Sequence, residues 1–484
     1  MSVTTHHPLY AASLERWRLV DDVCAGEEIV KEKGVDYLPM SNPLDQSDEN
    51  KARYRQYKFR AVLYEATGNT LDGLIGAAYR VDPTLVVPDE LAYLGDDADG
   101  TGVSIYQQSQ RCLAELLKKG RGGLLVDMPP VNGTLTVAQQ QAQNIRAQVI
   151  FFDARQVINW RTTRVGSKHM LSLVVIAETA QQISDDDFIL NEIEQYRALK
   201  LVGGKYKVEI WRKMKNVETG VEALAIAQEY FPLDGSGKPW DMIPFTFVGA
   251  TNNDINPDRA PLLRLATVNL AHYRNSADFE HSAFIVGQPQ PWMSGVDDTT
   301  RTFYSLPENK MKIGSGFPIM LPPGGQFAFA QPSPNTLIER AMDRKENQMI
   351  ALGARLVQAG TVAKTATESR GDQRVQHSVL SLCVANMSEA YTHCLGWVAR
   401  FMKVVPKDDM AYSVNQDYTE TNLDPQALAQ VIQSWQQGLL PKTDAWQYMR
   451  KVGLIRSDKP DKDIEGELDA EMAGGGLNEP AAVT

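Results

Sequence analysis

The pattern of apolar and polar positions divides the chain into an early helical region, a β-rich middle and a second helical region. The stretch "YRQYKFRAVLYEATGNTLDGLIGAAYRVDP", residues 54–83, has apolar residues three and four apart, which is the spacing of a helix face. We predict two helices here, separated at Gly68 and Asn69, with the second ending before Pro83. A third helix is predicted from about Ser104 to Lys118, ended by Gly120, and the following "GLLVDMP" predicts a short buried strand. Residues 1–50 show no clear pattern.

The middle of the chain is rich in β-branched and aromatic residues, separated by Gly, Asn and Asp, as strands and their turns are. Strands are predicted at "QVIFFD", "QVINWRTTRV", "HMLSLVVIAET", "KYKVEIWRKM", "VEALAIAQEYF" and "IPFTFVG". A helix is predicted over residues 184–199, where "SDDD" supplies the negative charge that a helix N-terminus favours. The middle is therefore predicted to be a β-rich module interrupted by one helix.

A long helix is predicted next, over residues 261–285. Its apolar positions keep a spacing of three and four, broken only by Glu280, and we call this set the seam: Leu263, Ala266, Leu270, Tyr273, Ala277 and Phe284. A helix of about 24 residues spans roughly 36 Å. His272 and His281 lie nine positions apart, half a turn out of phase, so they cannot ligate one metal ion. The segment is predicted to be a packing helix.

The region after Gly287 begins with loops and short strands and ends in helices. Ser333 and Pro334 predict a helix start leading into "TLIERAMDRKENQMIALGARLVQ", and Thr365 with Glu368 has the spacing of a capping box for the next helix. That helix carries an apolar stripe: Leu380, Cys383, Met387, Tyr391, Cys394, Val398 and Phe401. Two shorter helices are predicted after Pro425 and Pro441, and residues 473–484 are expected to be disordered.

Composition adds constraints on compartment and partners. The chain has 484 residues, 43% of them hydrophobic, and a formal net charge of −11 without a basic tract, which argues against binding nucleic acid by phosphate neutralisation. Its apolar run "LSLVVIA" is far shorter than a membrane helix needs. We see no secretory signal at the N-terminus and no CxxC pair among the four cysteines. These features predict a protein that folds in a reducing cytoplasm.

Several short motifs suggest chemistry but fail on inspection. "DGSGKP" (234–239) lacks the first glycine and the hydroxyl residue of a phosphate loop, and "DDADG" (96–100) lacks the twelfth-position glutamate of a calcium loop. His377, Cys383, His393 and Cys394 lack the spacing of a closed zinc site, and two of them belong to the apolar stripe. No serine elbow, HExxH or dinucleotide fingerprint occurs in the sequence. We therefore expect no catalytic residue, no metal site and no cofactor, and a protein that is not an enzyme.

The order of several weak fragments carries more information than any one of them. The early tyrosine-rich helix, then "GRGGLLVDMP", "QVINWR", "IPF", "PLLRLATVNLAHYRNSADFEHSAFIVGQPQP", "KIGSGFPIMLPPGG" and "TATESRGDQRVQHSVL" resemble, in this order, the portal proteins of tailed bacteriophages. The resemblance extends in outline from about residue 50 to 460. The first 45 residues and the tail do not contribute to it.

The resemblance implies an α+β portal fold with an α/β wing, long stem helices, a β-rich clip and a helical crown. Mapped onto this chain, the wing would be residues 1–135 and 286–403, with a β-rich module at 136–260 that holds the clip and a first stem segment. The first stem helix would be 134–148 or 184–199, and 261–285 would be the other. The crown would be 404–472. A tunnel loop would lie near 321–335, including Pro323, Gly324, Gly325, Gln326 and Phe327.

The same resemblance implies a structural function in the virion. Portal subunits form a homo-oligomeric ring, usually of twelve copies, at one capsid vertex. Double-stranded DNA passes through the channel during packaging and ejection without sequence-specific binding. The implied partners are the terminase packaging motor, head-tail adaptors, and the major capsid and scaffold proteins, with no membrane. The alternatives are a minor head or scaffold-type structural protein without a DNA channel, and a virion-associated enzyme.

Overall fold

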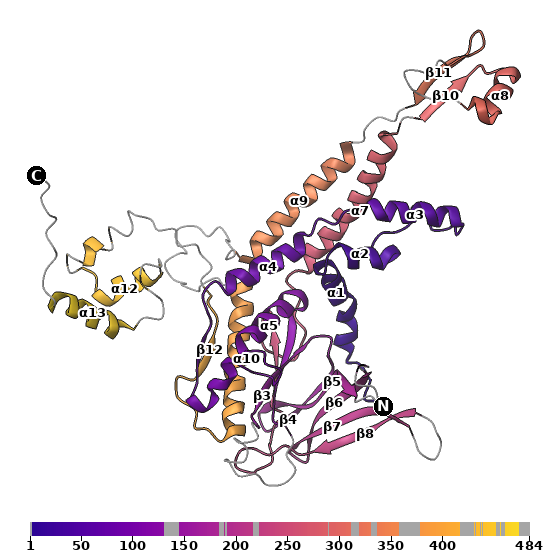
Figure 1. Cartoon of the computed structure of the whole chain (residues 1–484). Coiled ribbons are helices and arrows are strands. Elements are labelled where there is room, and N and C mark those ends of the chain that lie inside the picture. The colour runs from indigo at the N-terminus through magenta and orange to yellow at the C-terminus, as the bar shows by residue number, and fades with distance from the viewer. Residues whose placement is uncertain are drawn as a thin grey trace, which may run out of the picture. The chain divides into compact units, whose positions relative to one another are not determined.

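The structure is a computed structural model with an α+β fold (Figure 1). The contacts within the chain divide it into two compact units, Met1–Gln416 and Asp417–Thr484. The structure describes residues 2–129, 145–182, 188, 191–215, 222–288, 290–310, 319–330, 336–357, 378–416, 430, 432–435, 437, 439–451, 455 and 460–473.

The first unit begins with helices that the apolar pattern left unassigned. They are α1 (Pro8–Cys24), α2 (Glu27–Lys33) and η1 (Gly34–Asp36). Pro8 stands at the first helical position of α1, and the His7 side chain accepts a hydrogen bond from the Leu9 amide. Tyr10, Trp17, Val20 and Val23 of α1 are buried. Their spacing of seven, three and three is a helical signal already present in the sequence.

The two helices predicted over residues 54–83 exist, but their boundary was predicted wrongly. They are α3 (Asp48–Arg60) and α4 (Ala66–Ala78). An extended segment at 61–65 separates them, and Gly68 and Asn69 lie inside α4. The break follows from hydrogen bonds that this segment makes to a distant helix, described below, rather than from glycine.

The next elements match the sequence prediction closely. After β1 (Thr84–Val86) and η2 (Asp89–Gly95), α5 runs over Ile105–Lys119 and β2 over Arg121–Asp127. Ser104 and Gln107 form a capping box at the start of α5, and Gly120 ends it in the left-handed conformation. Every residue of β2 is buried.

The β-rich middle forms two antiparallel sheets. One has the order β3-β2-β9, and the other is a five-stranded meander, β4-β5-β6-β7-β8. Their bounds are β3 Gln148–Asp153, β4 Val157–Val165, β5 Lys168–Gln182, β6 Asn191–Val202, β7 Lys205–Lys215, β8 Glu222–Tyr230 and β9 Phe245–Gly249.

The prediction of a helix over 184–199 is wrong at residues 191–199, which the structure describes. Residues 191–199 belong to β6, which pairs with β5 on one side and β7 on the other. Residues 191–199 all pair with β5, and residues 195–199 pair with β7 as well. This long-range pairing outweighs the local charge signal. Of the other candidate for a first stem helix, 134–148, residues 145–147 are not helical and Gln148 begins β3; 134–144 lie outside the described residues.

Buried charges and aromatic rings join the two sheets. The Arg121 guanidinium of β2 lies 3.9 Å from the ring centre of Trp160 in β4 and 3.7 Å from that of Phe247 in β9. Asp127, at the other end of β2, accepts a 2.7 Å hydrogen bond from Arg197 of β6. Burial raises the pKa of Asp127, and the Arg197 charge opposes that rise. These contacts fix the meander against the three-stranded sheet.

The core of the first unit is organised around α10 (Val379–Met402), which packs against α5, β2 and β9. All seven residues of the predicted apolar stripe, from Leu380 to Phe401, are buried, so this prediction is confirmed. Ser378 caps the helix by accepting a hydrogen bond from the Ser381 amide. The predicted start at Thr365 lies outside the described residues. A strand after the helix, β12 (Ala411–Ser413), pairs with β1.

The remaining elements of this unit form a helical pair with a small module between its two helices. The helices are α7 (Leu263–Val286) and α9 (Thr336–Val357). Between them come β10 (Gln290–Ser294), α8 (Asp298–Ser305), η3 (Pro307–Asn309) and β11 (Gln326–Ala330). Figure 1 shows α7 and α9 side by side, with β10, β11 and α8 beyond their far ends. We call residues 290–310 and 319–330 the tip module, and the helical pair with it the arm.

In the second unit the structure describes α12 (Lys442–Lys451) and α13 (Asp461–Ala473). The helix predicted after Pro441 is confirmed, while α13 was not predicted. Ala445, Trp446 and Ile464 are buried there. The helix predicted after Pro425 and residues 474–484 of the predicted tail fall largely or wholly outside the described residues. Within the part of the chain that is described, no helix is both long and apolar enough to span a membrane.

The end of α5 provides a test of this packing. Gly120 has φ +73°, and a Cβ there would lie 2.7 Å from the Asp258 carbonyl oxygen. Gly166 has φ +63° with open space around it. We expect Gly166→Ala to cost about 1–2 kcal/mol from the left-handed backbone alone, and Gly120→Ala to cost roughly 1–3 kcal/mol more from overpacking. Thermal unfolding of both variants measures the difference, and equal losses would contradict the close approach.

Candidate assembly site

The seam of α7 is buried at the base of the arm and uncovered at its outer end. Ala266, Leu270, Tyr273 and Ala277 are buried, Leu263 is half-buried, and Phe284 is 41% exposed. The buried part packs against α1, α3, α4 and α9. The seam is therefore covered by this chain over only its first four turns.

Two buried polar residues of α7 fix the extended segment between α3 and α4. The Asn269 side chain accepts hydrogen bonds from the Thr67 amide (3.1 Å) and hydroxyl (2.8 Å), and it donates one to the Tyr64 carbonyl (2.6 Å). The Ser276 hydroxyl accepts from the Val62 amide at 2.8 Å and donates to the Val62 carbonyl at 2.7 Å. Buried polar groups need such partners. These bonds interrupt the early helix where the sequence alone suggested continuity.

Polar contacts also join α9 to α7. His272 Nε2 lies 3.3 Å from the Glu346 carboxylate, and Lys345 Nζ donates to the Asn275 side chain at 2.6 Å. His272 is buried, and this burial lowers its pKa although Glu346 acts in the opposite direction. No sequence motif predicts that these two helices pack together, because none of the contacting side chains is distinctive within its own helix.

The outer half of α7 contacts α3. The Tyr57 hydroxyl donates to Asp278 at 2.6 Å, and the His281 ring stands edge-on to Tyr57 at 5.6 Å. The Arg60 guanidinium lies 3.7 Å from the ring centre of Phe284. His272 thus faces α9 and His281 faces α3, as their half-turn offset predicted. Across the described ranges, no group of three His, Cys, Asp or Glu side chains is arranged to hold a metal ion.

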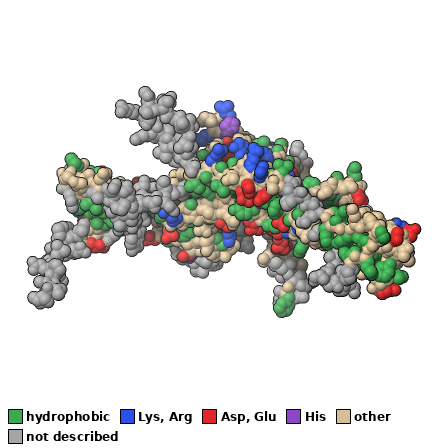
Figure 2. All heavy atoms as spheres, turned by 90° about the horizontal axis from the view of Figure 1, so that it is seen from above, with side chains coloured by type: hydrophobic (Ala, Val, Ile, Leu, Met, Phe, Trp, Pro, Cys, Tyr) green, Lys and Arg blue, Asp and Glu red, His purple; other side chains and the backbone are tan. Residues whose placement is uncertain are grey.

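The tip module has secondary structure but no core of its own. None of its described residues is buried. In the register of β10 with β11, Pro291 pairs with Phe329 and Met293 with Phe327, so these four side chains share one face of the hairpin. Phe329 is 46% exposed, and Trp292 on the opposite face is 41% exposed. Hydrophobic side chains gather at the right end of the view in Figure 2, over the tip module.

The five residues singled out for a tunnel loop lie in this tip module. Pro323, Gly324 and Gly325 form the turn that leads into β11, and Gln326 and Phe327 are the first residues of that strand. The Gly325 amide donates to the Pro322 carbonyl at 2.9 Å, and Gly324 has φ +86°. That this turn faces a channel stays a prediction.

The motifs rejected in the sequence have structural roles where they are described. Asp234 of "DGSGKP" accepts hydrogen bonds from the Ser236 and Lys238 amides, as a turn residue does. Asp97 of "DDADG" accepts from the Gly100 and Gly102 amides. Burial raises the pKa of Cys383 to about 12, so its thiol is a poor nucleophile at neutral pH. These groups stabilise loops and the core.

Comparison with known proteins gives a family match that covers the arm and α10. Residues 261–402, which begin just before α7 and end with α10, match the family described as "Domain of unknown function (DUF4055)", over less than a third of the chain. No curated protein matches the sequence. The solved structures similar to the chain include two necks of GTA particles.

The "Neck of empty GTA particle computed with C6 symmetry" has 12% identity and a TM-score of 0.38, over 89% of this chain and 98% of that chain. The "Neck of native GTA particle computed with C12 symmetry" has 13% identity and a TM-score of 0.36, over 78% and 88%. TM-scores this low do not establish a shared fold.

The burial of His272 predicts a pH dependence of stability, because it lowers the pKa of the imidazole. Because its folded pKa lies below the usual value, the unfolded chain takes up a proton first, and stability is lost as the pH falls below about 6.5. We expect His272→Gln to lose less stability than the wild type between pH 7.5 and pH 5. Unfolding midpoints in denaturant at both pH values measure this, and parallel curves for the two proteins would contradict it.

Proposed function

We propose that this chain is the subunit of a ring-forming portal of a tailed bacteriophage. Twelve copies would surround a channel through which double-stranded DNA enters and leaves the capsid. The ring would also dock the terminase motor and the head-tail adaptors, and contact the major capsid and scaffold proteins. The ordered sequence fragments that resemble portals support this proposal. The protein acts in it as a structural component, without catalysis.

The observation that carries the proposal is the uncovered apolar surface of the arm. One face of the tip-module hairpin carries the half-buried Pro291, Met293 and Phe327 beside the exposed Phe329, and the other face carries the exposed Trp292. A two-stranded hairpin without a buried face is marginally stable in water. Contiguous exposed apolar surface of this kind marks a protein–protein contact. A ring supplies that contact by placing the arms of neighbouring copies side by side.

The arm also changes the assignment of portal parts within this proposal. The two stem helices are α7 and α9, joined by polar contacts and running along each other. The clip is the tip module, since it is the element between the ends of the two stem helices. The five-stranded sheet then belongs to the body of the subunit, and the turn at Pro323 to the clip rather than to a tunnel.

Net charge fits passage of DNA rather than its capture. With −11 formal charges per chain, a ring of identical subunits has a strongly negative field that repels phosphates and limits adhesion. A scaffold-type or minor head protein would share the acidic charge but would have no need of a closed ring. Ring closure therefore separates these two functions.

Closure is measured by the mass of the assembled protein. At 53.8 kDa per chain, we expect native mass spectrometry to show a closed oligomer near twelve copies, and electron micrographs to show rings with a central hole. Phe329→Ser combined with Trp292→Ser should shift the protein to monomers, because both side chains lose apolar contact area. Phe231→Ser is the matched control, since Phe231 is also 46% exposed but lies after β8. A wild-type protein that remains monomeric at micromolar concentration would overturn the proposal.

A further inference from the structure

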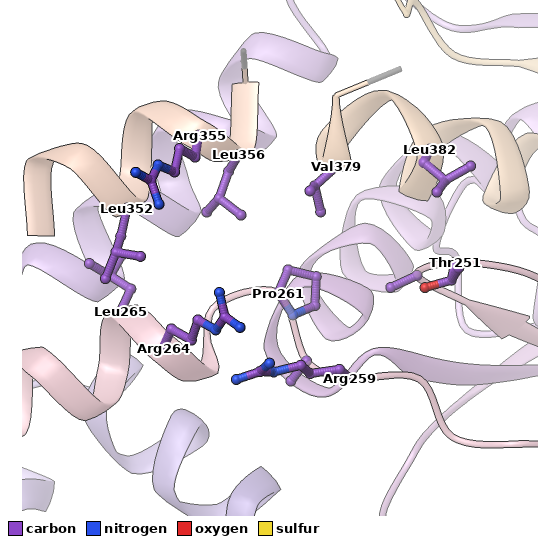
Figure 3. Close-up of a pocket in the computed structure, with 12 residues that line it drawn as sticks. Thr251, Arg259, Pro261, Arg264, Leu265, Leu352, Arg355, Leu356, Val379 and Leu382 are labelled. Atoms are coloured by element: carbon purple, nitrogen blue, oxygen red, sulfur yellow. The ribbon is translucent and has the colours of Figure 1, made fainter. Parts of the chain in front are cut away.

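A pocket of about 370 Å³ lies at the base of the arm, where α7 and α10 begin and α9 ends. Its floor is apolar and includes Leu265, Leu352 and Leu356. Three arginines complete the lining: Arg259 before α7, Arg264 in the first turn of α7 and Arg355 in the last turn of α9. Figure 3 shows these side chains around the same hollow.

The three guanidinium groups have no acidic partner within the described ranges. All three arginines are exposed, none forms a salt bridge with a described carboxylate, and the pocket lining contains no Asp or Glu. The neighbouring Asp258 accepts hydrogen bonds from the Thr251 and Asn252 amides instead. In a chain with an excess of eleven negative charges, three converging arginines without a counter-charge are an unusual local arrangement.

The N-terminal end of α7 increases the positive potential at Arg264. The α7 N-terminus has no side-chain cap and no acidic residue in its first turn, and the helix dipole places partial positive charge there. A cation in that first turn is electrostatically unfavourable without an anion nearby. Arg355 is in the opposite situation, because the C-terminal end of α9 favours a cation. The positive charge that has no nearby anion among the described residues is therefore concentrated between Arg259, Arg264 and the start of α7.

We propose that this pocket binds a phosphate group through Arg259, Arg264 and Arg355. A guanidinium group presents paired N–H donors that match phosphate oxygens. A phosphate offers enough oxygens and charge for more than one guanidinium, whereas a single carboxylate neutralises one. The apolar floor excludes water from one side of the site and so strengthens the ionic contacts. The phosphate comes either from solution or from the backbone of DNA, and the DNA source rests on the proposed portal function.

Calorimetric titration of the full-length protein with inorganic phosphate, at constant ionic strength, tests the site. We expect saturable binding that weakens about ten-fold or more in the triple variant Arg259→Gln, Arg264→Gln, Arg355→Gln. Arg340→Gln is the control, because it removes the same charge from an exposed position on the same helix as Arg355. Each single variant is measured too, so that misfolding of the triple variant does not decide the result.

Two further measurements distinguish free phosphate from DNA as the ligand, and both from a neighbouring copy of the chain in the same pocket. Fluorescence anisotropy of a short labelled DNA duplex measures DNA binding. If the triple variant loses affinity for the duplex as it does for phosphate, the DNA backbone is the source of the phosphate. If the triple variant binds the duplex as the wild type does but has lost phosphate binding, free phosphate is the ligand. Absence of phosphate binding to the wild type overturns the site. The site is also overturned if the triple variant still binds phosphate but no longer assembles, as measured by native mass spectrometry. The arginines would then bind carboxylates of a neighbouring copy. A wild type that binds phosphate as a monomer contradicts the portal function and not the site.

Discussion

The burial of α7 over only part of its length is the constraint on which the rest of the arm depends. Asn269 and Ser276 are buried, and each satisfies its polar atoms with backbone groups of residues 62–67. An unpaired polar group there would cost about 1–3 kcal/mol. The chain must therefore be extended between α3 and α4, and this geometry positions α3 along the outer half of α7. The inner half is thus a rigid base, while the outer half and the tip module have little cover from this chain.

Sequence reasoning succeeded where one chain buries an element completely. The α10 stripe was predicted residue by residue because each of its seven positions, from Leu380 to Phe401, packs inside the first unit. The same reasoning found α5 with its end at Gly120, and every strand of the two sheets except β6. Of the predicted seam, Ala266, Leu270, Tyr273 and Ala277 are buried within this chain. In these elements the apolar spacing, the caps and the burial all follow from the local sequence.

It failed where long-range contacts decide the outcome. An acidic stretch before β6 has the charge of a helix start, yet residues 191–200 pair with β5 and residues 195–202 pair with β7. Phe284 continues the seam but remains 41% exposed under Arg60. The helix α9 was predicted, but its pairing with α7 was not, since contacts such as Lys345 with Asn275 leave no pattern in either helix. The arginine pocket was likewise invisible, because its residues come from segments almost a hundred positions apart.

The central claim is that the apolar surface of the tip module is covered by the same module of another copy. Site-specific photo-crosslinking tests it most directly, with a benzophenone amino acid replacing Phe329 in the full-length protein and, as a control, replacing Phe231. If the tip modules of neighbouring copies cover each other, covalent oligomers form from the Phe329 position, with crosslinked peptides mapping to residues 290–330 of a second chain, and few form from Phe231. Crosslinks confined to single chains at Phe329, in a protein whose mass shows that it has assembled, would contradict it.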